Sequence, residues 1–210
     1  MKQSSSKARR HYSLDDYFLV ELESITKHEF YDGDIFAMAG ASLPHNHITS
    51  NLHALLRTAF RGSGCNAFTS DLRIATPGGL YTYPDVSVIC GAVELVAGRP
   101  DTATNPVVLI EVLSDATRDY DRGKKFDVYK QIPSLKEYVT VEQDAVLVEH
   151  WRRNPGTPWT AKKHTRLAGA VRLLTRRVSL PLAEIYRELS FASTIPGSRK
   201  PNRPRGPKSM

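Results

Sequence analysis

The sequence is poor in the features that mark secreted and membrane proteins. It has two cysteines in 210 residues, Cys65 and Cys90, and they form no CxxC pair. Two thiols suit a reducing compartment, so we expect no disulfide framework. No apolar run approaches the roughly 20 residues of a membrane span. The basic start of the chain is not followed by the uninterrupted apolar stretch of a secretory signal. We therefore expect a cytoplasmic protein without a membrane segment.

Acidic residues are missing from three parts of the chain. Residues 1–10, 152–183 and 192–210 carry four, eight and five basic residues, respectively, and no acid. Residues 11–151 hold 20 acidic and 11 basic residues, a net charge of −9, although the whole chain is +7. The positive charge of the chain therefore lies in these three basic segments, which flank an acidic segment at 11–151. Such segments suggest binding to a polyanion.

Several familiar catalytic motifs are also absent. The sequence has no G-x-S-x-G elbow, no P-loop and no H-E-x-x-H. Residues 62–67 match a loose G-x-G-x-x-A, but this segment ends a predicted helix and enters a strand, the reverse of a dinucleotide-binding turn. We interpret it as a helix end and a turn.

The patterns that are present predict one α+β domain over residues 11–191, between disordered basic tails at 1–10 and 192–210. A capping-box pattern at Ser13 and Asp16 predicts a helix over 13–23, and Asp32-Gly33 predicts a hairpin turn. The expected architecture is a central mixed sheet flanked by helices, with an added hairpin region. The remaining predicted helices span 44–61, 123–132 and 182–189, and the strands span 65–69, 72–75, 84–90, 106–114, 137–141, 146–151 and edge strands within 155–180.

Two acids stand in apolar surroundings. Asp85 follows Pro84 at the start of a hydrophobic strand, and Glu111 interrupts another between Ile110 and Val112. A buried carboxylate needs a partner, a metal or a proton. Two carboxylates at adjacent strand ends would suit Mg²⁺ or Mn²⁺. The alternatives are that Asp85 caps a turn and that Glu111 pairs with a structural arginine.

A lysine is expected on the inner face of the following helix. Residues 122, 125, 129 and 132 lie along one helical seam, which places Lys125 beside Tyr129 and Ile132. Lys124 falls on the solvent side. A lysine on an apolar seam needs an anionic partner, either a substrate phosphate or, as the alternative, Glu111 in a purely structural ion pair.

The ordered set of motifs resembles the Uma-two family of restriction endonucleases, within the PD-(D/E)XK nuclease superfamily. The matching segments are KHEFYDGDIFAMAGAS (27–42), SDLRI (70–74), YPDVSVICG (83–91), NPVVLIEVLS (105–114), DYDRGKKFDVYKQIPSLKEYVTVEQD (119–144) and VEHWRR (148–153). This resemblance implies a restriction endonuclease-like fold, with an α/β-type core, and metal-dependent phosphodiester hydrolysis.

The resemblance assigns roles by position. Asp85 matches the Asp of the PD motif and Glu111 the following acid. The usual lysine two positions later is replaced by Leu113, and the family supplies it from the next helix, at Lys125. Glu29 matches an upstream acid that would be a further metal or water ligand.

Three further positions follow from the same matches. The backbone carbonyl of Val112 would be a third metal ligand beside Asp85 and Glu111. Asp34 and His45 match accessory positions, although His45 suits a hydrogen-bonded helix start equally well. A zinc pair of His45 and His47 lacks further His or Cys nearby.

The expected activity is that of an Mg²⁺- or Mn²⁺-dependent DNA endonuclease, with homodimerisation implied by the resemblance alone. The alternatives are a catalytically inactive nuclease fold that binds nucleic acid or assembles with partners, and a hydrolase of another phosphate ester. The candidate residues for holding the DNA backbone are Arg152, Arg153, Lys162, Lys163, Arg199, Lys200, Arg203 and Arg205.

Overall fold

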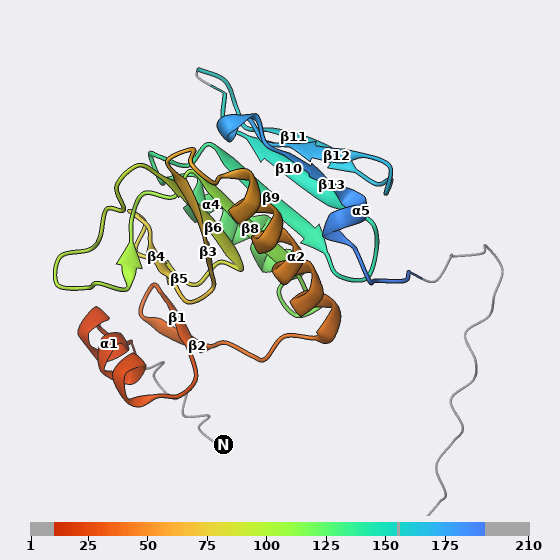
Figure 1. The fold of residues 1–210 in the computed structure, drawn as a ribbon. Coiled ribbons are helices and arrows are strands. Elements are labelled where there is room, and N and C mark those ends of the chain that lie inside the picture. The colour runs from red at the N-terminus through yellow and green to blue at the C-terminus, as the bar shows by residue number, and fades with distance from the viewer. Residues whose placement is uncertain (1–10, 155, 192–210) are drawn as a thin grey trace, which may run out of the picture.

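The computed structural model describes residues 11–154 and 156–191. Figure 1 shows the N-terminal helix and hairpin at one end of the molecule and the C-terminal hairpin at the other, with a sheet and the longest helix between them. The tails predicted at 1–10 and 192–210 lie outside the described residues.

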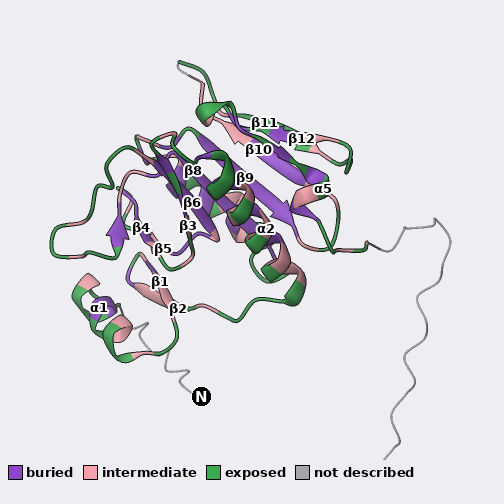
Figure 2. Cartoon of the chain, viewed as in Figure 1, coloured by how far each residue is buried: buried purple, intermediate pink, exposed green. Residues whose placement is uncertain are grey.

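A six-stranded mixed sheet forms the centre of the molecule. Its strands run in the order β11-β10-β9-β8-β6-β3, and only the β8–β9 pair is parallel. Every residue of β8 and β9 is buried, as Figure 2 shows for the middle of the sheet. Such burial explains the continuous apolar run in β8. The strands span Cys65–Thr69 (β3), Val86–Cys90 (β6), Val108–Leu113 (β8), Glu137–Glu142 (β9), Val148–Arg152 (β10) and Thr160–His164 (β11).

The structure contains a second, five-stranded sheet in the order β2-β1-β5-β4-β7. The expectation of a single central sheet is therefore wrong. Two strands of the second sheet are only two residues long, too short to give a periodic signal. The predicted hairpin at Asp32-Gly33 is confirmed, and both turn residues have positive φ. The strands are His28–Tyr31 (β1), Asp34–Ala37 (β2), Arg73–Ala75 (β4), Tyr81–Thr82 (β5) and Thr102–Ala103 (β7).

Two of the predicted helices are confirmed. Helix α1 (Leu14–Glu23) begins at a capping box in which the side chains of Ser13 and Asp16 each bond the other's backbone N–H. Helix α2 (Leu43–Ala59) has Ser42 as N-cap and buries Ile48, Leu52 and Leu56. These three apolar residues belong to the core on one face of the six-stranded sheet.

The helix predicted over 123–132 begins earlier and contains a wider turn. It consists of α3 (Arg118–Tyr120), the π-helical turn η1 (Asp121–Lys125) and α4 (Phe126–Tyr129). Phe126 and Tyr129 pack against Tyr138 on the sheet face opposite α2. A π-helical turn is a single-turn irregularity that often occurs at functional sites.

The C-terminal part forms a small unit above β10 and β11. It consists of β12 (Ala170–Arg172), the 3-10 turn η2 (Thr175–Arg177), β13 (Ser179–Pro181) and α5 (Leu182–Ile185). The β12–β13 hairpin is antiparallel, as expected for the added hairpin region.

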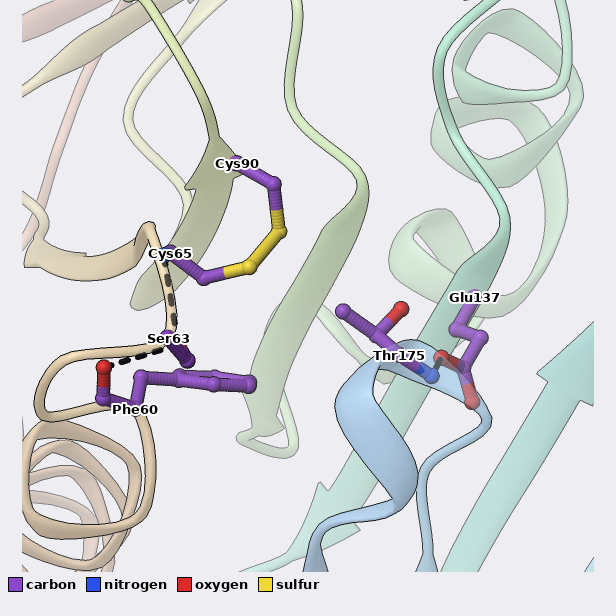
Figure 3. Close-up of a disulfide and its surroundings, with 6 residues drawn as sticks. All are labelled: Phe60, Ser63, Cys65, Cys90, Glu137 and Thr175. Atoms are coloured by element: carbon purple, nitrogen blue, oxygen red, sulfur yellow. Dashed lines mark hydrogen bonds between the residues drawn. A yellow bond between two sulfur atoms is a disulfide. The ribbon is translucent and has the colours of Figure 1, made fainter.

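The expectation that the cysteines stay unpaired is wrong in this structure. Cys65 on β3 and Cys90 on β6 lie directly opposite each other and form a disulfide (Figure 3). The turn before β3 is fixed by the Ser63 hydroxyl, which accepts the Cys65 N–H and donates to the Phe60 carbonyl. The 25-residue separation gives no sequence signal, because only the strand register brings the two thiols together.

Within residues 11–154 and 156–191, no helix combines the length and the apolar character needed to cross a membrane.

Candidate active site

Lys125 lies at the centre of a cluster of carboxylates. Its Nζ is 2.9 Å from Glu29 Oε1, 3.0 Å from Glu111 Oε1 and 3.5 Å from Asp121 Oδ1. The lysine comes from η1, Glu29 from β1 and Glu111 from β8. The structure therefore brings together three of the four catalytic residues predicted from the sequence.

Asp85, the fourth, joins the cluster through the backbone. Its N–H donates to Glu111 Oε2 (3.3 Å), and its Oδ2 accepts the N–H of Val112 (2.7 Å). Asp85 precedes β6, which pairs with β8 so that Val86 lies opposite Ile110. The pairing of these two strands thus fixes the two carboxylates side by side.

His45 closes the cluster from the α2 side. Its Nε2 lies 3.2 Å from Asp85 Oδ2. Burial lowers the pKa of His45, but the hydrogen bond and the charge of Asp85, with a smaller effect of the Val112 backbone, raise it overall. The contact places His45, an accessory candidate from the sequence, directly beside Asp85. His47 instead faces Glu188 at 3.6 Å, so the two histidines have different partners and form no zinc pair.

Glu29 is held by its own sheet. The Thr82 hydroxyl on β5 donates to Glu29 Oε1, the oxygen that also contacts Lys125. The predicted accessory residue Asp34 lies at the turn end of the same hairpin, opposite Tyr31 and two register positions from the Glu29–Phe36 pair.

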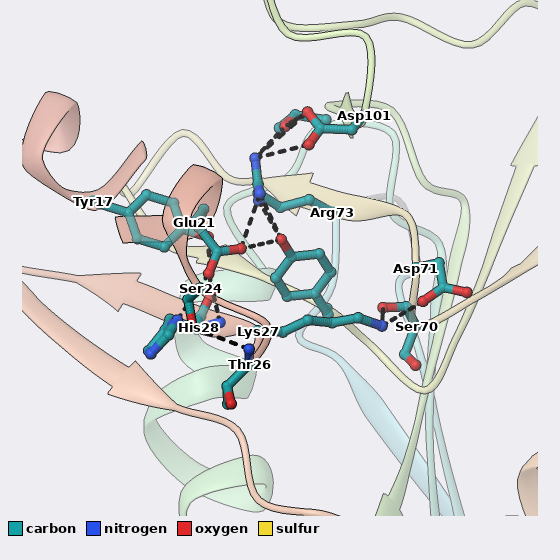
Figure 4. A network of polar contacts seen from close by, with 12 residues as sticks. Tyr17, Glu21, Ser24, Thr26, Lys27, His28, Ser70, Asp71, Arg73 and Asp101 are labelled. Carbon is teal, nitrogen blue, oxygen red and sulfur yellow. Dashed lines mark hydrogen bonds and ion pairs between the residues drawn. The ribbon is translucent and has the colours of Figure 1, made fainter. Parts of the chain in front are cut away.

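A polar network fixes the strand that carries Glu29 (Figure 4). Glu21 on α1 accepts the N–H of His28 (2.8 Å), the residue before Glu29. The other oxygen of Glu21 pairs with Arg73 (3.0 Å) and accepts the hydroxyl of Tyr83. Because Tyr83 stands two residues before Asp85, this network connects the backbones on either side of the cluster.

Two residues without a role assigned from the sequence also contact the cluster, Asp121 on η1 and Tyr129 on α4. Asp121, 4% exposed, points toward Lys125, and the Tyr129 hydroxyl donates to Glu111 Oε1 at 2.7 Å. The predicted seam correctly placed Lys125, Tyr129 and Ile132 inside. Arg122 instead pairs with Glu142 and Glu149, because the wider turn rotates Asp121 into the inner position. The Asp-x-x-x-Lys spacing is the sequence signal that could have identified Asp121 as a neighbour of Lys125.

Burial dominates the electrostatics of the cluster. It raises the pKa of Glu111 above its ordinary value, with Lys125 opposing the shift, and it also raises the pKa of Asp121. Burial alone would lower the pKa of Lys125, but Glu111 and Glu29 raise it well above the ordinary value. The lysine therefore keeps its positive charge near neutral pH.

Asp85 and Glu111 are the residues of the cluster that could hold a metal ion. Nowhere in the described part of the chain do three or more His, Cys, Asp or Glu side chains form a group that could hold a metal ion. Mg²⁺, however, commonly uses only one or two protein carboxylates, together with water and substrate phosphate oxygens. Asp85 and Glu111 supply two adjacent carboxylates, so the residues present fit that mode of binding.

The predicted DNA-contacting residues separate into different environments. Lys163 pairs with Glu149 at 3.0 Å. Arg153 donates to the carbonyls of Lys130, Ile132 and Pro133. Arg152 and Lys162 line a separate cavity. Arg199, Lys200, Arg203 and Arg205 lie outside the described residues.

Comparison with known proteins identifies relatives along most of the chain. Two proteins of Synechocystis sp. (strain ATCC 27184 / PCC 6803 / Kazusa) are each 34% identical to it. "Uncharacterized protein slr1290" aligns over 182 residues, 85% of this chain and 93% of the relative. "Uncharacterized protein sll1609" aligns over 145 residues, 69% of this chain and 82% of the relative.

A solved structure shares the fold. It is the crystal structure of "a putative nuclease belonging to DUF820" from Anabaena variabilis ATCC 29413, with a TM-score of 0.66 and 18% identity over 81% of this chain and 96% of that one. The Uma2 family model, described as "Putative restriction endonuclease", matches residues 14–183. On this match and on the two relatives, the chain belongs to the Uma2 family.

Proposed function

We propose that this protein is a divalent-metal-dependent endonuclease that hydrolyses phosphodiester bonds of DNA. The observation that carries the proposal is the convergence of Asp85, Glu111 and Lys125 from three separate elements. Two adjacent carboxylates with a buried ammonium group form a site suited to a cation and a phosphate oxygen.

Asp85 and Glu111 would hold Mg²⁺ or Mn²⁺, with the backbone carbonyl of Val112 as a further ligand. The bound metal would supply Lewis-acid stabilisation of phosphate charge and a more acidic water. Lys125 would contribute a fixed positive charge beside the scissile phosphate. Glu29 would hold and orient Lys125 through its 2.9 Å contact.

The exposure of the side chains indicates the direction of substrate entry. The exposed fraction of the side chain is 17% for Asp85, 15% for His45 and 13% for Glu29. It is only 5% for Glu111 and 6% for Lys125. A DNA phosphate would therefore approach over Asp85 and His45. Lys125 would lie beneath it.

One observation favours a second candidate, a nuclease fold that binds nucleic acid or assembles with partners without catalysis. The ammonium group of Lys125 already has three carboxylate neighbours, as in a structural ion-pair cluster. Such a module would bind DNA in a salt-dependent way, with neither metal binding nor turnover.

The experiment that separates the two candidates measures cleavage and metal binding together. Plasmid DNA, single-stranded DNA and RNA are incubated with Mg²⁺ or Mn²⁺, and Mn²⁺ binding is followed by calorimetry. The test variants are Asp85→Asn and Glu111→Gln. Asp127→Asn is the matched control, because Asp127 is an exposed acid of α4 that pairs only with Lys130 among the described residues.

We expect the two test variants to lose Mn²⁺ affinity and at least about 100-fold in cleavage rate, with the control unchanged. Equal cleavage by all four proteins would mean that the activity comes from another site or a contaminant. DNA binding without metal binding or turnover would support the second candidate.

A homodimer is a further proposal, which rests on the family. The apolar side chains exposed on and beside α1 are consistent with it, because Leu22 and Ile25 are 77% and 106% exposed. Light scattering at several concentrations tests this proposal. A constant monomer mass would reject it.

A further inference from the structure

A cavity of about 410 Å³ lies between the β10–β11 ribbon and the turn that leads into β12. Four basic side chains line it, from Arg152, Lys162, His164 and Arg172, and none of its lining residues is acidic. Ala168, Gly169 and Ala170 form the remaining wall. These small residues leave the centre of the cavity open to a ligand.

The strand register explains why the basic side chains gather there. On β10 and β11, Lys162 lies opposite His150 and Arg152 lies opposite Thr160, so even-numbered residues share one face. Lys163 points to the other face, where Glu149 neutralises it. The alternation thus separates two adjacent lysines, and only Lys162 faces the cavity.

The polar groups of this cavity are incompletely satisfied. The Nε of Arg152 and the Nε2 of His164 are buried, and neither has a hydrogen-bond partner. An unpaired buried polar atom is costly, so native proteins usually supply a partner or a ligand for it. Here the unpaired atoms lie on two of the four basic residues that surround the cavity.

No protein carboxylate fills this role. Within the described residues, no acid lies within ion-pair distance of Arg152, Lys162 or Arg172. Glu137 is the acid opposite Arg152 in the sheet, but its oxygens accept from His150, Leu174 N–H and Thr175 N–H. Burial, Lys162, His150 and Arg152 all lower the pKa of His164, as expected where positive charge is not neutralised.

We propose that this cavity binds a phosphate group, held by Arg152, Lys162, His164 and Arg172. A guanidinium and an ammonium group provide charge-assisted donors to phosphate oxygens, and the imidazole provides a further donor when protonated. The ligand is inorganic phosphate or a phosphodiester of a nucleic-acid backbone, which share this chemistry.

The phosphate cavity is separate from the proposed nuclease site. On neighbouring strands, Glu111 lies opposite Thr140, Thr140 opposite Glu149, and Glu149 opposite Lys163. The side chains of these four residues therefore share one face of the sheet. Arg152 is aligned with Val108, three residues before Glu111, and faces the other side of the sheet. The two proposals can therefore fail independently.

The test uses the full-length chain labelled with ¹³C and follows the imidazole C–H signals of His164 by NMR, assigned with His164→Gln. One titration adds sodium phosphate at constant ionic strength, and the other adds a short duplex DNA without free phosphate. The test variant is Arg152→Gln/Lys162→Gln, and Lys163→Gln is the matched control on the opposite face. Thermal unfolding verifies that each variant folds, and Lys162→Gln alone replaces the double variant if that one does not.

We expect a saturable shift of the His164 signals in the wild type, with at least tenfold weaker binding in the double variant and less than a twofold change in Lys163→Gln. A shift with phosphate but not with DNA identifies inorganic phosphate as the ligand, and a shift with DNA identifies the nucleic-acid backbone. No shift with either probe would overturn the proposal. Equal weakening in the test and control variants would also overturn it, because it would indicate general charge attraction only.

Discussion

Lys125 Nζ lies 3.0 Å from Glu111 Oε1, although a helix carries one residue and the adjacent buried strand the other. Both side chains are almost fully buried, with 6% and 5% exposure. A buried ion pair of this kind gives little net stability compared with apolar residues, but the loss of one partner is strongly destabilising. The pair therefore couples the stability of the fold to the integrity of the site.

Replacing Lys125 should affect both properties at once. Lys125→Met removes the positive charge beside Glu111 and Glu29, so we expect at least about 100-fold slower cleavage and a loss of about 3 kcal/mol in the free energy of unfolding. Urea unfolding and a plasmid cleavage assay measure the two effects. Lys124→Met is the control, since Lys124 is exposed on the same turn and should change neither value. Similar losses in both variants would contradict the assigned position of Lys125.

Tyr129 should act as a positioning residue. Tyr129→Phe keeps the ring beside Tyr138 but removes the hydroxyl that donates to Glu111. We expect a loss of about 1–2 kcal/mol in stability, because the buried carboxylate loses a donor. If the hydroxyl also orients Glu111 for metal binding, Mn²⁺ affinity falls while the affinity for DNA without metal is retained. Unchanged stability and Mn²⁺ affinity would show that the hydrogen bond has no effect on Glu111.

The stabilising effect of Glu137 should depend on pH. Burial opposes ionisation of this side chain, but hydrogen bonds from His150, Thr175 and Leu174 lower its pKa overall. A carboxylate with a depressed pKa stabilises the folded state above its ordinary pKa, and this contribution is lost as the pH falls through the folded-state value. We expect Glu137→Gln to cost about 3 kcal/mol at pH 7.

The cost of Glu137→Gln should shrink as the pH falls below about 4, because the protonated acid then resembles the amide. Urea unfolding at several pH values measures it. Glu184→Gln, a change at a partly exposed acid of α5, is the control. If the difference in the free energy of unfolding between Glu137→Gln and the wild type stayed constant with pH, ionisation of Glu137 would be excluded as its cause.

Reduction of the disulfide should destabilise the protein. The bond between Cys65 and Cys90 closes a segment of 25 residues, and losing such a cross-link costs about 3 kcal/mol through the entropy of the unfolded chain. Cys65→Ala/Cys90→Ala and the wild type in dithiothreitol should show similar losses in chemical unfolding. Thiol titration of the unreduced, denatured protein should find no free thiol. Two reactive thiols and no effect of reductant would restore the sequence-based expectation of unpaired cysteines.

Local patterns in the sequence were sufficient to predict most elements of the fold. The capping box at Ser13 and the turn at Asp32-Gly33 act within a few residues, and both are present as predicted. The position of Lys125 on the inner face also followed from periodicity, because Tyr129 and Ile132 share that face. Carboxylates that interrupt apolar strands, such as Glu111, were recognisable because their burial requires a partner.

Features that depend on long-range register were not predicted. Cys65 and Cys90 become opposite residues only when β3 pairs with β6. The five-stranded sheet contains strands of two residues, whose formation depends on neighbours such as Arg73 and its network with Glu21. Asp121 was missed for another reason, because the expected α-helical spacing assigned its inward position to Arg122.

The wide turn at Asp121–Lys125 holds one residue more than an ordinary α turn. Removing one residue there would leave an α turn with the same hydrogen bond between its two ends, so the helical segments on either side would keep their orientation. Asp121 would then stand three residues before Lys125 and still face it. A homologue can therefore retain this arrangement with an Asp-x-x-Lys spacing, which a search for the Asp-x-x-x-Lys spacing of this chain would not detect.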